Sequence, residues 1–220
     1  ARDLSLVGQA DIYVIHDPQS LAVIEDFHRG KMLSRIHIDL SNPNQEVLSF
    51  FKPYLKKYDY LVFSMKESSI PGIQTKKAYI LPAIDPFIPK NVPLEASLCH
   101  KILEDFDINP RKPLASQISR FDPWKDPLGV IQAYYIAKNE IPDLQLALVG
   151  IVEGKDDLEA FEIFEHVKKH AKGDPDIFLF ASSQALGSVS NEMLVNAVQT
   201  ASDVVLQKSL KEGFGLTVTE

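Results

Sequence analysis

Two glutamates, Glu212 and Glu220, bracket the run GFGLTVT at the end of the sequence. A carboxylate accepts two hydrogen bonds at once, which suits the hydroxyl groups of a sugar or a ribose. The backbone amides of Gly213, Phe214 and Gly215 come before a segment expected to be helical, and amides at a helix start suit a phosphate or a sugar hydroxyl. The run therefore indicates a site for a polar ligand that carries phosphate, sugar or both.

A purely structural interpretation of the same run stays open. Thr217 and Glu220 match the capping-box spacing, in which Glu220 would serve only to begin a helix. The β-branched residues of TVT have weak helix propensity, and propensity alone would favour a strand there. The run is neither a Walker loop, because no Gly-Lys-Ser/Thr follows, nor a GxGxxG loop.

Two cations stand in SRFDPWKD, residues 119–126, directly after a predicted strand. The guanidinium of Arg120 can bind a phosphate through two parallel hydrogen bonds, and the ammonium of Lys125 can supply a mobile point charge. The alternative is that Arg120 pairs with Asp122 and Lys125 is simply exposed. Asp126 followed by proline predicts a capped helix start.

Histidines and aspartates follow the first two predicted strands: His16 and Asp17 after one, and His37 and Asp39 at the end of the other. Such histidines could serve acid-base chemistry or bind a metal, but no cysteine joins them and neither HxxxH nor HxH spacing occurs. We therefore expect no metal site. A hydrogen-bonded structural role is the alternative for both histidines. Nucleophilic catalysis gets little support, because no GxSxG motif occurs and Cys99 lies in a helical pattern.

Short apolar runs alternate with helical patterns along the chain, which predicts two Rossmann-like α/β domains with parallel sheets covered on both faces. The four prolines within residues 82–93 exclude a helix interior or a central strand and predict a linker. We place the domains at residues 1–88 and 89–220. The predicted strands are 11–15, 35–39, 60–64, 77–81, 114–119, 144–149, 177–180 and 203–207, and the predicted helices are 19–28, 44–58 with a kink at Pro53, 94–106, 127–139, 156–170 and 190–201.

Composition narrows the class of protein. A hydrophobic fraction of 45% and a charged fraction of 24% are those of a globular domain. The net charge of -7 argues against a nucleic-acid partner. No apolar run reaches the roughly 18 residues of a membrane span, and the amino terminus resembles no signal or transit peptide. The lone cysteine fits a reducing compartment, so we expect a cytoplasmic location.

Taken together, SRFDPWKD, LALVG (146–150) and DVVLQKSLKEGFGLTVTE (203–220) resemble the carboxyl-terminal half of retaining GT-B glycosyltransferases of family 4, also called group 1. Glu212 and Glu220 match the E-x7-E pair of that family. Within the family, VIHDPQS, HIDLSNPN and SRFDPWK resemble the trehalose synthases. The resemblance implies a retaining hexosyltransferase that moves glucose reversibly from a nucleoside diphosphate glucose to glucose.

The resemblance also implies roles on the donor side. Arg120 and Lys125 would bind the diphosphate, Glu212 would face the hydroxyls of the donor sugar, and Glu220 would accept from the ribose. The amides of 213–216 would lie close to sugar and phosphate. Further donor-binding positions by this resemblance are Gly150, Gly213, Phe214, Gly215 and Leu216.

On the other side of the reaction, the resemblance places His16 beside the donor glucose as a catalytic group, and Asp17, His37 and Asp39 toward the acceptor. UDP-glucose and ADP-glucose are both open as donors. No cofactor is required, assistance by Mg²⁺ is left open, and so is a homodimer. The other functions left open are a trehalose phosphorylase of the same fold and a non-catalytic α/β module that binds a nucleotide or a sugar.

The sequence also departs from the family pattern. Asp126 stands where members usually carry glycine, at a predicted helix cap. The glycine-rich loop near the family's amino terminus is missing, and so are the elements that should follow Glu220. We therefore expect both domains to be truncated and this chain alone to be inactive.

Overall fold

The computed structural model describes residues 6–27, 30–151 and 158–220. The chain divides into two compact units, one of Ala1–Ala83 and the other of Ile84–Lys211 with Gly215–Glu220; the short segment Glu212–Phe214 groups with the first unit. The predicted domain boundary between residues 88 and 89 stays a prediction, and both boundaries lie inside the proline-rich linker.

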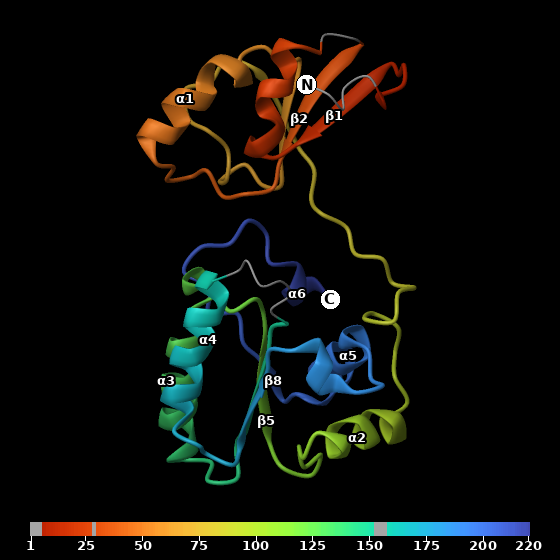
Figure 1. Ribbon diagram of the computed structural model, residues 1–220, viewed down its shortest axis with the longest axis vertical. Helices are drawn as coiled ribbons and strands as arrows, with labels where there is room; N and C mark the ends of the chain where they lie inside the picture. The colour runs from red at the N-terminus through yellow and green to blue at the C-terminus, as the bar shows by residue number, and fades with distance from the viewer. Residues whose placement is uncertain (1–5, 28–29, 152–157) are drawn as a thin grey trace. The chain divides into compact units, whose positions relative to one another are not determined.

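The first unit contains a four-stranded parallel sheet in the order β1-β2-β3-β4 (Figure 1). The strands are β1 Ile12–His16, β2 Lys31–Ile36, β3 Tyr60–Phe63 and β4 Lys76–Tyr79, and the helices are η2 Pro18–Glu25 and α1 Gln45–Leu55. Apolar residues of both helices pack with alternate residues of the strands into one core. Arg35 and Val62, which alternate with these core positions and so belong to the other face of the sheet, are buried as well.

Two predicted elements of the first unit need correction. The segment after β1 is a 3-10 helix, Pro18–Glu25, and residue 28, which the prediction included, lies outside the described residues. The second strand is Lys31–Ile36 and not 35–39, because its register on β1 begins at Lys31 and ends at Arg35. The apolar alternation of RIHID continues beyond the strand end and misled the prediction.

The second unit has helices on both faces of its sheet, as predicted. In Figure 1 α3 (Pro127–Lys138) and α4 (Leu158–Ala171) lie on one side, and α2 (Ala96–Asp105) and α5 (Asn191–Ala201) on the other. Each face has its own apolar core. The strands β5 Leu114–Ile118, β6 Gln145–Val149, β7 Ile177–Phe180 and β8 Val204–Val205 are parallel in the order β7-β6-β5-β8.

The pattern of burial follows from the sequence. β5 and β6 are buried at every position, as expected of a strand that is covered on both faces. β8 is only two residues long, shorter than the predicted 203–207, and forms one edge of the sheet. Residues 156 and 157, where the helix predicted at 156–170 begins, lie outside the described residues.

Candidate functional site

The strand order of the second unit creates a topological switch point. The chain runs from β5 outward through β6 to β7 and then returns to β8 on the other side of β5. Ligands of such open sheets bind beyond the carboxyl ends of the strands at this point. Arg120 and Lys125 follow β5, and the segment that ends in α6 (Leu216–Thr219) follows β8. The residues predicted to bind the donor thus follow the two strands that define the switch point.

Arg120 is 77% exposed and pairs with Asp122 at 3.2 Å, which is the structural alternative considered from the sequence. Asp122 also caps the short helix η3 (Pro123–Lys125), because its Oδ1 accepts from the amides of Trp124 at 2.8 Å and Lys125 at 3.1 Å. An exposed ion pair of this kind contributes little to stability. The guanidinium can therefore leave Asp122 for a phosphate at small cost.

Lys125 lies in a loop that the sheet itself fixes. Its carbonyl oxygen accepts a hydrogen bond from Nε2 of Gln117 at 2.7 Å, and Gln117 is a buried residue of β5. Lys125 is half-buried and not simply exposed. Gln117 was missed from the sequence, where a glutamine in LASQI carries no signal of a role. It anchors the backbone from which the cation projects.

Asp126 begins α3, as predicted, with its Oδ1 accepting from the amide of Gly129 at 3.1 Å. Its backbone is left-handed, with φ 47 and ψ 51, a conformation in which glycine meets no steric penalty. This explains how glycine and aspartate can both serve here. The other carboxylate oxygen pairs with Lys208, which follows β8. The Asp126–Lys208 pair therefore joins the two sides of the switch point.

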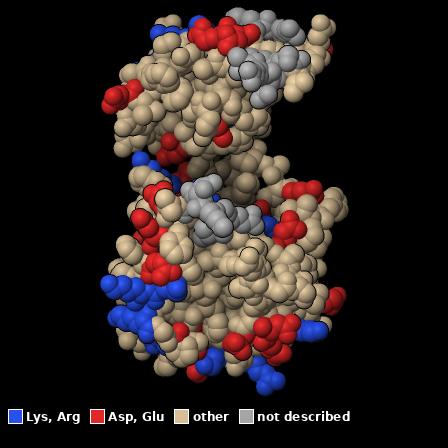
Figure 2. All heavy atoms as spheres, viewed as in Figure 1, with Lys and Arg blue, Asp and Glu red and all other residues tan. Residues whose placement is uncertain are grey.

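Two further contacts hold the segment after β8 along the loop after β5. The amide of Leu210 donates to the carbonyl oxygen of Trp124 at 2.7 Å, and Nζ of Lys211 lies 4.6 Å from the centroid of the Trp124 ring. The indole is 52% exposed. In Figure 2 blue side chains gather in one patch over the second unit, and red side chains form separate patches.

Gly150 follows β6 and lies against the backbone of the β5 loop. Its amide donates to the carbonyl oxygen of Phe180 at 2.9 Å, and a Cβ added there would collide with the carbonyl oxygen of Ser119. Only glycine allows this close approach. The predicted donor-binding role of Gly150 stays a prediction.

The closing run forms a helix, and its cap differs from the prediction. Gly215, with φ 85, precedes α6, whereas Thr217 lies inside that helix and Glu220 follows it. The capping-box interpretation of Thr217 and Glu220 is therefore wrong, and so is the strand that propensity favours. Glu212 accepts from the amide of Gly213 through Oε1 at 3.0 Å. Phe214 is half-buried and Leu216 is the first residue of α6.

In the first unit, the ends of β1 and β2 bring the predicted histidines together. Nδ1 of His16 lies 2.9 Å from Nε2 of His37, and the rings are nearly parallel with centroids 5.1 Å apart. Oδ1 of Asp17 accepts from the amide of His37 at 2.9 Å. Asp39 is turned to local contacts, because its two oxygens accept from the amide and hydroxyl of Ser41 at 2.8 and 3.0 Å.

The backbone of Asp17 has φ 62 and ψ 168, a region occupied almost only by glycine. Residues in such conformations cost about 1–3 kcal/mol and cluster at functional sites. The amide of Asp17 donates to the carbonyl oxygen of Arg35 at 2.9 Å, so the neighbouring strand holds the strained turn in place. This strain is independent support for a function at the strand end.

Arg35 is a charged residue that the sequence reading missed. It is only 8% exposed on β2, and its NH2 lies 3.3 Å from Oγ of Ser64, which follows β3. Its NH1 is buried with no hydrogen-bond partner among the described residues. Burial lowers the pKa of the Arg35 guanidinium, and the nearby Asp17 carboxylate opposes that shift. The signal was present as an arginine inside the apolar run KMLSRI, but it was assigned to a strand start.

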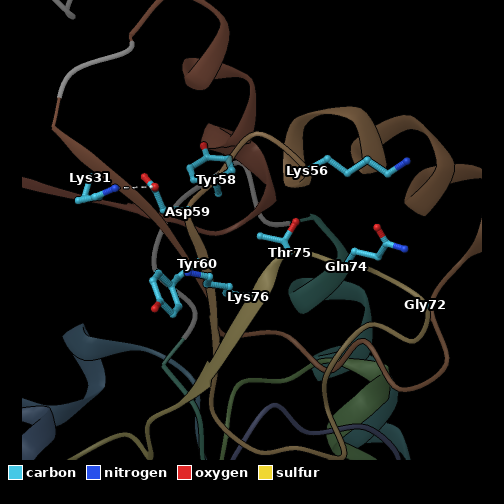
Figure 3. Close-up of a pocket in the computed structure, with 9 residues that line it drawn as sticks. All are labelled: Lys31, Lys56, Tyr58, Asp59, Tyr60, Gly72, Gln74, Thr75 and Lys76. Carbon is cyan, nitrogen blue, oxygen red and sulfur yellow. Dashed lines mark hydrogen bonds and ion pairs between the residues drawn. The ribbon is translucent and has the colours of Figure 1, made fainter.

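A cavity of about 810 Å³ lies at the amino ends of the strands of the first sheet, whereas His16 and His37 lie at their carboxyl ends (Figure 3). Lys31, Tyr60 and Lys76, which begin β2, β3 and β4, line it together with Lys56 and Asp59. In Figure 3 the side chain of Lys31 points toward Asp59, whereas that of Lys56 extends away from both. None of the predicted site residues lines this cavity.

Within the described ranges, no group of three or more His, Cys, Asp or Glu side chains is placed to hold a metal ion. A search of the same ranges for a helix both long and apolar enough to cross a membrane gives no candidate.

Two protein families match different parts of the chain. Residues 1–69 match the family model "Trehalose synthase, N-terminal domain", and residues 100–220 match "Glycosyl transferases group 1". The chain is 42% identical over 216 residues to a trehalose synthase of Rubrobacter xylanophilus, which covers 96% of this chain and 50% of the relative. It is 43% identical over 212 residues to a trehalose synthase of Pyrococcus horikoshii, again covering 96% and 50%. The chain thus spans about half the length of the curated relatives it matches.

Among solved structures, a UDP-forming trehalose-phosphate synthase from Burkholderia xenovorans superposes with a TM-score of 0.72 at 16% identity. The match covers 97% of this chain and 56% of that one. At this identity the likeness establishes the fold alone. The two α/β units, each built on a parallel sheet, are those of the GT-B fold.

Proposed function

Because the chain belongs to the glycosyl transferase group 1 family, we propose that the protein containing it transfers glucose from a nucleoside diphosphate glucose to glucose and makes trehalose. The similarity to trehalose synthases supports the product. The observation that carries the proposal is the switch point of the second unit, where Arg120 and Lys125 follow β5 and the glutamate-bracketed run follows β8.

On the donor side, Arg120 and Lys125 bind the diphosphate. Breaking the bond between sugar and phosphate builds negative charge on the departing diphosphate, and fixed cations and amide dipoles lower that barrier. Gln117 holds the loop of Lys125 before the substrate arrives, which reduces the reorganisation needed for charge stabilisation. Glu212 accepts hydrogen bonds from the sugar, and Glu220 accepts them from the ribose.

On the acceptor side, the carboxylate of Asp17 and the ring of His37 bind hydroxyl groups of the accepting glucose, and His16 lies beside the donor sugar. The His16–His37 contact and the Asp17–His37 hydrogen bond support a single preorganised cluster. Transfer proceeds with retention: the acceptor hydroxyl attacks the anomeric carbon from the face that the diphosphate leaves, and its proton passes to the leaving phosphate oxygen. Such a reaction requires no protein nucleophile.

Product analysis of the full-length protein tests the proposal. With glucose as acceptor, UDP-glucose or ADP-glucose should yield a disaccharide whose nuclear magnetic resonance spectrum shows the α,α linkage of trehalose. Addition of EDTA to the same assay decides the need for Mg²⁺. Trehalose cleavage that requires inorganic phosphate, and not a nucleoside diphosphate, would establish a phosphorylase. Tight nucleotide binding without any transfer would establish a binding module.

Lys125→Ala sharpens the test. A charge-assisted contact contributes roughly 1.5–3 kcal/mol, so turnover should fall by about 10- to 100-fold. The matched control is Lys101→Ala, which removes an exposed lysine of α2 and should leave turnover unchanged. Wild-type turnover in Lys125→Ala contradicts the assignment of this cation to the diphosphate.

A further inference from the structure

The proline-rich linker is fixed to the second unit by a buried side chain. Nδ2 of Asn196, on α5, donates to the carbonyl oxygens of Pro89 at 2.8 Å and Val92 at 2.7 Å. Asn91 closes the turn by donating from its side chain to the carbonyl oxygen of Asp85 at 2.7 Å. The backbone on both sides of Lys90 is therefore held against α5.

The side chain of Lys90 reaches the carboxylate of Glu220. The two form an ion pair through Nζ and Oε2, and their side chains are only 22% and 10% exposed. The helix before Glu220 is tied to α5 as well, because Nε2 of Gln199 donates to the carbonyl oxygen of Thr217 at 3.1 Å. α5 thus supports both partners of the pair.

This pairing matters for a carboxylate that must bind hydroxyl groups. A carboxylate removed from water is a costly charge unless a cation compensates it. Nζ of Lys90 meets this carboxylate at Oε2, and a charge-assisted contact of this kind restricts the orientation of the group. A carboxylate held in this way can present acceptor positions to a neighbouring hydroxyl pair.

We propose that Lys90 is the positioning residue for Glu220: it holds this carboxylate in the orientation that accepts the ribose hydroxyls of a nucleoside diphosphate. The inference rests on the proposed function, in which Glu220 is the ribose acceptor. It assigns a binding role to the linker, which composition and proline content mark only as a connection between domains.

Discrimination between two nucleotides measures this role. In the full-length protein, the dissociation constant of UDP or ADP is compared with that of its 2′,3′-dideoxy analogue by calorimetry. The unchanged protein should prefer the ribose form by about 10-fold or more. Lys90→Met should reduce this preference to within about 3-fold, and Lys90→Arg, which keeps the charge, should restore most of it. Lys101→Met is the matched control and should retain the full preference.

Kinetics give a second measurement. Because the ribose lies away from the reacting bond, Lys90→Met should raise the KM of the nucleotide sugar by about 10-fold with little change in kcat. Lys90→Gln serves as a second variant if the methionine disturbs folding. Equal weakening of both nucleotides in Lys90→Met, with no loss of preference, overturns the proposal because it indicates a merely structural lysine.

Glu220→Gln distinguishes the positioning role of Lys90 from the ribose-binding role of Glu220 on which it rests. If Glu220→Gln loses the ribose preference and Lys90→Met retains it, the ribose role of Glu220 stands and the positioning role of Lys90 is wrong. If Glu220→Gln retains the preference, the ribose assignment in the proposed function fails first. Loss of the preference in both variants, with rescue by Lys90→Arg, supports both.

Discussion

Each unit has, after its first strand, an aspartate of positive φ that precedes a proline, and the two aspartates are used differently. Asp17-Pro18 follows β1 and Asp126-Pro127 follows β5 by way of η3. Both aspartates have positive φ, 62 and 47, and both precede a helical segment. The carboxylate of Asp126 caps its own helix, whereas that of Asp17 accepts from the amide of His37 on the neighbouring strand end.

The helices that follow reflect this difference. The capped segment is the regular twelve-residue helix α3, and the uncapped one is the 3-10 helix η2. A cap satisfies an amide that an α-helix start leaves without a partner. Asp17 supplies no such bond to its own helix, which leaves its carboxylate at the strand end beside the histidines. The carboxylate of Asp126 thus serves its own helix and the pair with Lys208, whereas that of Asp17 lies beside the histidines of the candidate site.

The far ends of the two helices differ as well. Nζ of Lys138, the last residue of α3, pairs with Asp174 at 3.1 Å and Asp176 at 2.8 Å and is largely buried. Glu25, the last residue of η2, pairs with Lys57 at 2.6 Å, and both side chains are exposed. α3 therefore has a capping hydrogen bond at its start and a largely buried ion pair at its end, whereas η2 has no side-chain cap and its terminal ion pair is exposed. Three experiments test how far this contrast extends.

The largest expected effect is on turnover at position 17. Asp17→Asn keeps an oxygen that accepts from the His37 amide but removes the negative charge, so we expect kcat to fall by about 10- to 100-fold. The free energy of unfolding should change by less than about 1 kcal/mol. Steady-state kinetics and urea unfolding of the full-length protein measure the two quantities.

The same substitution at position 126 is the matched control. Asn is as good a helix cap as Asp, so Asp126→Asn should leave kcat within about 3-fold of the unchanged protein, equivalent to less than about 1 kcal/mol. Equal losses of turnover in the two variants would abolish the contrast between a structural and a functional aspartate.

The second effect is on the free energy of unfolding, and substitutions by alanine and glycine at position 126 and by glycine at position 17 measure it. Asp126→Ala loses the cap and keeps a Cβ in the left-handed region without the polar side chain that helps aspartate adopt it, which should cost about 1–2 kcal/mol, whereas Asp126→Gly should cost less than about 0.5 kcal/mol. At position 17, glycine relieves strain of about 1–3 kcal/mol and loses one hydrogen bond of about 1 kcal/mol, so Asp17→Gly should not destabilise. Urea unfolding followed by circular dichroism measures all three; a clear destabilisation by Asp17→Gly would show that its backbone is unstrained.

The smallest effect concerns pH and the far end of α3. The hydrogen bond from Lys138 lowers the pKa of Asp176 below its usual 3.8, so this stabilisation is present above about pH 4 and is lost as pH falls through the lower folded-state pKa. Burial by itself lowers the pKa of Lys138, but hydrogen bonds to Asp176, Tyr134 and Asp174 outweigh it and raise the pKa above 10.5. The contribution of the lysine is full below that value and is lost only at higher pH.

Lys138→Met should therefore cost about 1 kcal/mol near pH 7 and less near pH 2, as measured by urea unfolding at both values. Lys57→Met removes the exposed pair at the end of η2 and should cost less than about 0.5 kcal/mol at either pH. A Lys138→Met penalty that is independent of pH would assign its effect to packing and not to charge.

The sequence predicts the repeated strand–helix order well because the central strands are short segments dominated by apolar residues, as in LQLALV around β6. It misplaces β2, since the alternation in RIHID continues after the last paired residue. The predicted cap of α6 at Thr217 is also wrong. Both Thr217 and Gly215 carry a local signal for a helix start, and the helix begins after the left-handed Gly215.

Contacts between distant segments explain the rest. Composition indicates a buried guanidinium at Arg35 only weakly, and no local pattern announces that Lys90 meets Glu220 or that Gln117 holds the Lys125 loop. These pairs depend on how strands and helices pack, and single-sequence periodicity contains no information on that. Motif residues could be selected from the sequence, whereas the residues that position them could not.

Trp124 is the single tryptophan of the sequence, and it lies at the switch point beneath the ammonium of Lys211. The emission of an indole responds to nearby charge and to exposure to water. A diphosphate that draws Lys211 or Arg120 toward itself would alter both around this one ring. If a diphosphate binds as proposed, the emission of Trp124 should change, so binding of UDP or ADP to this chain can be followed by fluorescence without a label.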